Sequence, residues 1–97
     1  MIIGVLTLQF HLHGNRSLKG KRKIAQSLKQ KLRNKFNVAV AEVEAMDVHE
    51  KLVLGVVTTA NETARVESRL AKALAMVEAI SPAELTNCNT EIFSDSD

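Results

Sequence analysis

The side chains of this sequence with the clearest chemical potential are its cations, which gather near the N-terminus. The first 41 residues contain nine Lys or Arg and no Asp or Glu, whereas the rest of the 97-residue chain contains four cations and eleven acids. The two parts carry charges of +9 and −7, which the net charge of +2 conceals. Because charged groups stay in water unless they are paired, this pattern predicts a polarised surface. The alternative is that the two parts neutralise one another across the fold.

Basic residues surround a predicted helix start at Ser17, which is a favourable N-cap. A helix N-terminus offers free N–H groups and the positive end of its dipole to an anion. Further cations continue along the same helix for roughly 15–20 Å at 1.5 Å per residue. We predict that this surface binds the phosphates of a nucleic acid through Arg16, Ser17, Lys19, Lys21, Arg22, Lys23, Lys29 and Arg33. The alternative is a lysine-rich helix that is merely solvated.

Recognition of RNA bases on an open sheet needs exposed aromatic residues in the central strands. The chain has no Trp, no Tyr and three Phe, and Phe10 and Phe36 fall on predicted core stripes. We therefore expect any nucleic acid to be bound through its backbone and shape, with little sequence preference.

The remaining reactive groups do not predict a reaction. His11 and His13 share a strand face but have no third ligand nearby, and Cys88 has no linked His. The four glycines match no phosphate-binding loop. Glu42 and Glu44 are expected to pair with Lys51 across a hairpin. The sequence predicts no catalytic residue, no metal site and no cofactor.

The elements that must position these residues follow from hydrophobic periodicity and capping signals. A second helix is expected to begin at Asn61 or Thr59, the latter through a capping box with Glu62, and to end at Ser81-Pro82. The other predicted elements are strands over 2–12, 38–44, 52–60 and 84–93 and a helix over 17–35.

This order, β-α-β-β-α-β, predicts an α+β ferredoxin-like fold in which two helices cover one face of a four-stranded antiparallel sheet. One domain over residues 1–93 is expected, followed by a disordered acidic tail over 94–97. The sheet face without helices carries Val53 and Val57 or their neighbours, so it should be apolar at its centre. We expect homodimerisation through this open face, with a solvated sheet as the alternative.

Targeting signals are not evident in the sequence. The opening apolar stretch has no basic residues before it, unlike a secretory signal, and no stretch approaches the ~20 apolar residues that span a bilayer. The single cysteine excludes a disulfide framework. We expect a cytoplasmic protein that does not engage a membrane.

Three stretches of the sequence resemble a known family. They are MIIGVLTLQFHL at the N-terminus, RSLKGKRK, and LKQKLRNKFNVAVAEVE. Together they are similar to the YlxP-like family of small bacterial proteins, a domain family of unknown function, and the resemblance is strong over residues 1 to about 60. It implies a ferredoxin-like fold. Because members are often encoded beside genes for translation and ribosome maturation, it also implies an RNA- or ribosome-linked role.

These observations favour a non-enzymatic protein that binds RNA or the ribosome through its basic first helix. The alternative is a dimeric interaction module that docks an acidic protein partner through the same helix. A small-molecule sensor with its ligand at a dimer seam is a third possibility left open by the sequence.

Overall fold

The computed structural model describes residues 1–95 and has the predicted order of elements. Each predicted strand boundary agrees with the structure to within one residue. In chain order, the elements are β1 (Ile2–His11), α1 (Leu18–Lys35), β2 (Ala39–Glu44), β3 (Lys51–Ala60), α2 (Thr63–Ile80) and β4 (Glu84–Ser94).

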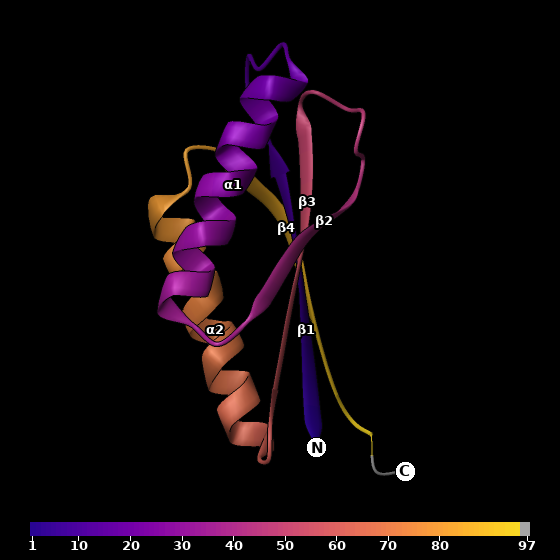
Figure 1. The fold of residues 1–97 in the computed structure, drawn as a ribbon, viewed down its shortest axis with the longest axis vertical. Coiled ribbons are helices and arrows are strands. Elements are labelled where there is room, and N and C mark those ends of the chain that lie inside the picture. The colour runs from indigo at the N-terminus through magenta and orange to yellow at the C-terminus, as the bar shows by residue number, and fades with distance from the viewer. Residues whose placement is uncertain (96–97) are drawn as a thin grey trace.

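The four strands form one antiparallel sheet in the order β2-β3-β1-β4. The long central strands β1 and β3 pair along their full length, from Ile2 opposite Ala60 to His11 opposite Lys51. β2 and β4 form the two edges. Both helices lie on the same side of the sheet (Figure 1). The predicted ferredoxin-like α+β fold is therefore confirmed.

The core lies between the helices and the sheet, because both layers turn an apolar face inward. In β1 and β3 every second side chain points to the helices, and these residues are almost completely buried. No helix among residues 1–95 is long and apolar enough to cross a membrane. The central core residues are Leu6, Leu8 and Phe10 from β1, Leu52, Leu54 and Val56 from β3, Ala25, Leu28 and Leu32 from α1, and Val66, Leu70, Ala73 and Val77 from α2.

The open sheet face is apolar at one end and polar at the other. Val5 lies beside Val57, and Ile3 lies beside Phe93, near the chain termini. Val57 and Phe93 are 42% and 48% exposed. Toward the other end, Gln9 lies between Asn87 of β4 and Val53 of β3, and Val53 is only 1% exposed. The apolar patch is thus real but displaced from the predicted centre of the sheet.

The start of α2 differs from the prediction. The helix follows Glu62, and no side chain caps its N-terminus. The Thr59 hydroxyl, which was expected to form a capping box, instead donates to the Ile2 carbonyl oxygen at 2.8 Å. This bond ties β3 to the beginning of β1, so the capping prediction for Thr59 and for Asn61 is wrong.

The C-terminal end is held to the N-terminus as far as the structure describes it. Ser94 belongs to β4, and a carboxylate oxygen of Asp95 lies 3.0 Å from the Met1 ammonium. The expectation of a disordered tail concerns residues 94–97, of which 96 and 97 lie outside the described residues.

Candidate nucleic-acid interface

The outer side of α1 presents a row of cations that extends away from the core. Ala25, Leu28 and Leu32 face the sheet, so the remaining circumference of the helix is free for charged residues. Five of the predicted cations lie there, over about 21 Å of helix at 1.5 Å per residue. We call these residues, with Arg16 just before the helix, the basic face of α1: Arg16, Lys19, Arg22, Lys23, Lys29 and Arg33.

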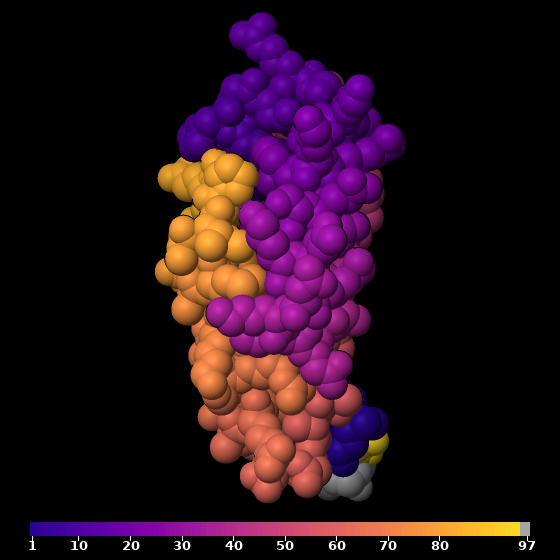
Figure 2. All heavy atoms as spheres, turned by 60° about the vertical axis from the view of Figure 1, so that its left-hand side comes forward, coloured from indigo at the N-terminus to yellow at the C-terminus, as the bar shows by residue number. Residues whose placement is uncertain are grey.

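No acidic side chain neutralises the basic face of α1. Among residues 1–95, no carboxylate lies within 4.0 Å of any of its six cations, and α1 itself contains no acid. All six side chains are exposed except Lys29, which is half-buried. Figure 2 shows α1, in purple and magenta, and α2, in orange, on one side of the molecule. The positive charge is therefore available to an anion.

Ser17 caps the helix as the sequence predicts. Its backbone is extended, and its hydroxyl accepts a hydrogen bond from the Gly20 amide at 3.0 Å. Asn15 donates to the carbonyl oxygens of Ser17 and His49, which fastens the helix start to the loop between β2 and β3. The Asn15 side-chain oxygen occupies the space that a Cβ at residue 20 would need. The close packing of Asn15 therefore favours a glycine at position 20.

Lys21 is not part of this exposed surface, although the sequence groups it with the other cations. Its side chain is 2% exposed. The ammonium donates to the carbonyl oxygens of Ala45 and Met46 at 2.8 and 3.1 Å, and to that of Lys51 at 3.3 Å. It also forms an ion pair with Glu42, with 2.8 Å between Nζ and Oε2.

This burial corrects two expectations. Lys21 is enclosed by its own chain, so its ammonium cannot reach a phosphate on the surface. Glu42 forms its ion pair with Lys21 rather than with Lys51, and in the sheet Glu44 lies opposite Val53. Lys51 instead lies beside His11 of β1. Of the nine cations in the first 41 residues, Lys21 is the one that pairs with a described acid.

Arg33 is held in position by the sheet. Its Nη2 donates to the Val40 carbonyl oxygen of β2 at 2.7 Å, which leaves other N–H groups of the planar guanidinium for a ligand. Beside it lies a shallow hollow of about 360 Å³ lined by Gln26, Lys29, Gln30, Arg33 and Asn34. Amides and cations together can contact phosphates, riboses and base edges.

The other candidate groups remain apart from α1's basic face. The rings of His11 and His13 meet edge to face with centroids 4.1 Å apart, and His13 Nε2 lies 2.9 Å from Glu84 Oε1. Cys88 is exposed on the edge strand β4. Within residues 1–95, no three His, Cys, Asp or Glu side chains gather in a way that could hold a metal ion.

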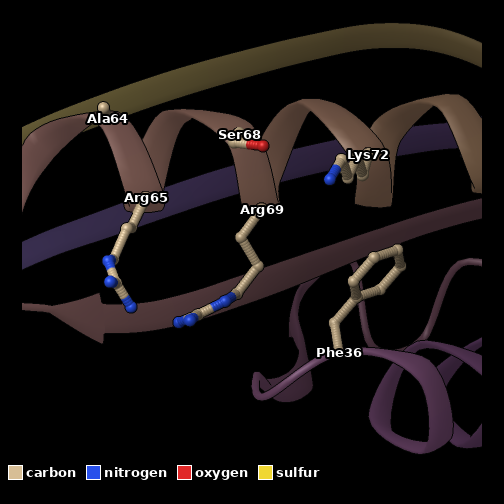
Figure 3. A pocket seen from close by; sticks show the side chains of 6 residues that line it. All are labelled: Phe36, Ala64, Arg65, Ser68, Arg69 and Lys72. Carbon is tan, nitrogen blue, oxygen red and sulfur yellow. The ribbon is translucent and has the colours of Figure 1, made fainter.

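A second basic surface, on α2, was not predicted from the sequence. Arg65, Arg69 and Lys72 line a hollow of about 420 Å³ together with Phe36, Ala64 and Ser68, and we call these six residues the α2 groove. Phe36 rises toward α2 from the end of α1 (Figure 3). The signal was present in the sequence as the i, i+4, i+7 spacing of the three cations, but it was hidden by the negative total of its half of the chain.

Solved structures share this fold over nearly the whole chain. At3g17210 from Arabidopsis thaliana has a TM-score of 0.57 and 12% identity, covering 98% of this chain and 96% of that one. SnoaB, a cofactor-independent oxygenase from Streptomyces nogalater, has a TM-score of 0.53 and 12% identity, covering 98% and 94%. Protein Atu4242 from Agrobacterium tumefaciens has a TM-score of 0.55 and 9% identity, covering 97% and 92%. At these identities the likeness shows the fold alone.

Sequence relatives support the resemblance noted above. The uncharacterised protein YlxP of Bacillus subtilis (strain 168) is 26% identical over 92 residues, which cover 95% of this chain and all of that protein. The family model described as a protein of unknown function, DUF503, matches residues 3–90. Since the match spans most of the sequence, this chain belongs to the DUF503 family.

Proposed function

We propose that this protein binds structured RNA, on the ribosome or on an assembling subunit in the cytoplasm, and that it does so without catalysing a reaction. The observation that carries the proposal is the basic face of α1, whose six cations have no acidic partner among residues 1–95. RNA is a polyanion whose phosphates attract such a surface and release counterions when they bind it.

The contacts would be with the backbone rather than with base sequence. The cations of the basic face of α1 extend over about 21 Å of helix, a length over which several phosphates of a helical stem can be contacted. Arg33 Nη2 donates to the Val40 carbonyl oxygen, and this bond fixes the position of the guanidinium. Its remaining N–H groups can then be presented to a phosphate. Ser17 contributes by fixing the helix start, since its hydroxyl is engaged with the Gly20 amide.

The test is fluorescence anisotropy with a labelled, blunt RNA hairpin at a fixed KCl concentration. Replacing both Lys19 and Lys23 by Gln should weaken binding by about tenfold, because two phosphate contacts are lost. A matched control replaces Lys31 and Lys35, which are exposed on α1 outside its basic face, by Gln. The control changes the net charge by the same amount but should bind within about twofold of the original protein.

Equal weakening by both pairs of substitutions would contradict the proposal, because it would mean that only the net charge matters. Failure of the original protein to bind the hairpin at low salt would also contradict it. That result would favour the alternative, an acidic protein docked on α1, which a pull-down from nuclease-treated lysate would retain.

The proposal includes a second copy of the chain on the open sheet face. Four strands spaced about 4.8 Å apart and six to eleven residues long offer a face of about 600 Å² per copy. A stable interface of standard size buries about 800 Å² per partner, so side chains at the rim would bring the area to that size. The exposed Val57 and Phe93 lie on this face, opposite the helices. In such a dimer, the basic face of α1 in each copy would point outward.

A further inference from the structure

The α2 groove combines features that a solvated helix does not require. It is an open hollow of about 420 Å³, and a second hollow of about 430 Å³ continues beyond Phe36 and Lys72, which line both. The second part is lined mainly by apolar atoms of Ala75, Met76 and Ala79, together with Lys35. A cationic section is thus joined to a more apolar one, with an aromatic ring where they meet.

The cations of the groove are separated from the acids of the same helix. Arg65, Arg69 and Lys72 follow i, i+4, i+7 spacing on one flank of α2. At about 100° per residue, Glu67 and Glu78 lie about 120° or more around the helix from each of them. The nearest acid is Glu62, whose Oε2 lies 3.8 Å from Arg65 Nε in a solvent-exposed pair. Such an exposed ion pair contributes little to stability, so the guanidinium of Arg65 remains available to a ligand.

Arg69 is fixed in position by the sheet beneath it. Its Nη1 donates to the Thr58 hydroxyl at 2.6 Å and to the Thr59 carbonyl oxygen at 3.1 Å. The Thr58 hydroxyl in turn donates to the Asn37 carbonyl oxygen at 2.8 Å, next to Phe36 in the chain. Within residues 1–95, Nη2 and Nε of Arg69 have no hydrogen-bond partner. A preorganised guanidinium therefore offers its free edge toward the groove.

Phe36 is the one aromatic residue of the described chain beside these cations. Phe10 is buried in the core, and Phe93 lies on the opposite face of the sheet. Phe36 ends α1 as its C-cap and is half-buried, so its backbone is fixed while part of the ring stays accessible. Figure 3 shows the ring projecting from the end of α1 toward α2, while Arg65 and Arg69 reach down from α2.

We propose that the α2 groove binds an unpaired nucleotide of the RNA whose helical stem lies on the basic face of α1. A base would stack on Phe36, and the flanking phosphates would pair with Arg65 and Arg69. Aromatic stacking tolerates any base, and arginine forks match phosphate oxygens. This inference rests on the proposed RNA-binding function and adds a preference for stems that carry a single-stranded extension.

The test compares two labelled RNA hairpins with the same stem, one blunt and one with a single-stranded overhang of four uridines. Anisotropy titrations should show about tenfold tighter binding of the overhang hairpin, since stacking of a base on an aromatic ring is the added contact. Phe36→Leu should remove this gain while leaving the affinity for the blunt hairpin unchanged. Phe36→Tyr, which keeps a ring, should retain the gain.

Two controls separate the site from general effects. Phe93→Leu removes an exposed aromatic residue from the other face and should leave the overhang gain intact. Arg65→Gln should reduce the gain, whereas Lys51→Gln, which removes a cation of the same half of the chain outside the groove, should not. Thermal melts of each variant establish that it is folded at the temperature of the titration.

The outcomes distinguish this inference from the function on which it rests. Absence of binding to the blunt hairpin overturns the proposed function. Binding of the blunt hairpin without a gain from the overhang overturns the α2 groove as a nucleotide site and leaves the basic face of α1 in place. A gain that survives Phe36→Leu overturns it equally, because stacking would then occur elsewhere.

Discussion

The ammonium group of Lys21 joins α1 to the hairpin formed by β2 and β3. It bonds three carbonyl oxygens and lies against Glu42, and one of those carbonyls belongs to Ala45, whose positive φ of 57° is unusual for a residue with a Cβ. A buried ion pair adds little net stability when it is complete, but removing one partner leaves the other uncompensated. Lys21 therefore acts as a structural residue.

Replacing Lys21 by Met should lower the free energy of unfolding by about 3 kcal/mol, because Glu42 and the loop carbonyls lose their donor. Urea denaturation followed by circular dichroism measures this change. Lys31→Met on the same helix is the control, since Lys31 is exposed and forms no ion pair within residues 1–95. Equal stability of the two variants would show that the Lys21 contacts contribute nothing.

Gly20 should not respond to substitution as an ordinary helical glycine does. In an exposed helix Gly→Ala stabilises by about 1 kcal/mol, but here the new Cβ would displace the Asn15 side chain and its bond to His49. We expect Gly20→Ala to be destabilising in the original protein and stabilising when Asn15 is also Ala. A double-mutant cycle from urea midpoints measures this coupling, and simple additivity would contradict it.

The contrast between Ser17 and Lys21 shows what local sequence determines. The Ser17 cap depends on residues three positions away, and it was predicted correctly. Helical periodicity places Lys21 in line with Ala25, Leu28 and Leu32, so its burial could have been predicted. The carbonyl groups that its ammonium binds lie 24 to 30 positions further along the chain, so local sequence could not identify them. The Thr59 prediction was wrong for the same reason, since the Ile2 carbonyl is distant in sequence.

At the scale of elements, α2 lies close against the sheet at Gly4. A Cβ at this position would overlap the Val66 side chain and lie 2.8 Å from Leu70 Cδ1. Both residues belong to the buried face of α2. The glycine thus lets α2 approach β1, and this approach sets the position of the cations on the helix.

Gly4→Ala should lower the free energy of unfolding by about 1–3 kcal/mol, as expected when a closely packed core must accept an added methyl group. Gly55→Ala is the matched control in β3. There the new Cβ would lie 3.0 Å from Cγ1 of Val43, an exposed side chain on the edge strand that can move. Guanidinium denaturation of both variants makes the comparison, and an equal loss would contradict the close approach of α2 at Gly4.

At the scale of the whole molecule, the fold separates two faces of different chemical character. The helices carry the basic face of α1 and the α2 groove on one side, and the sheet exposes Val57 and Phe93 on the other. Strand parity was enough to predict the open face, because alternate residues of β1 and β3 must point away from the core. The charge of each half of the chain was not enough to predict the α2 groove, since the acids and cations of α2 occupy different flanks.

The proposed dimer predicts a specific response at Val57. Val57→Glu would place a charge in the apolar end of the open sheet face and should convert a dimer into a monomer. Val48→Glu is the control, because Val48 is similarly exposed in the loop between β2 and β3. Size-exclusion chromatography with light scattering reports the mass. A monomeric mass for the original protein at tens of micromolar would refute the dimer.

The central claim is that the basic face of α1 binds RNA phosphates, and the most direct measurement is the salt dependence of affinity for a blunt RNA hairpin. Each neutralised phosphate contributes about 0.7–0.9 to the slope of log affinity against log salt concentration. With most of the six cations engaged, the account predicts a slope of about −4, which Lys19→Gln with Lys23→Gln reduces by about 1.5. A slope near zero, or one that this pair of substitutions leaves unchanged, would contradict the account.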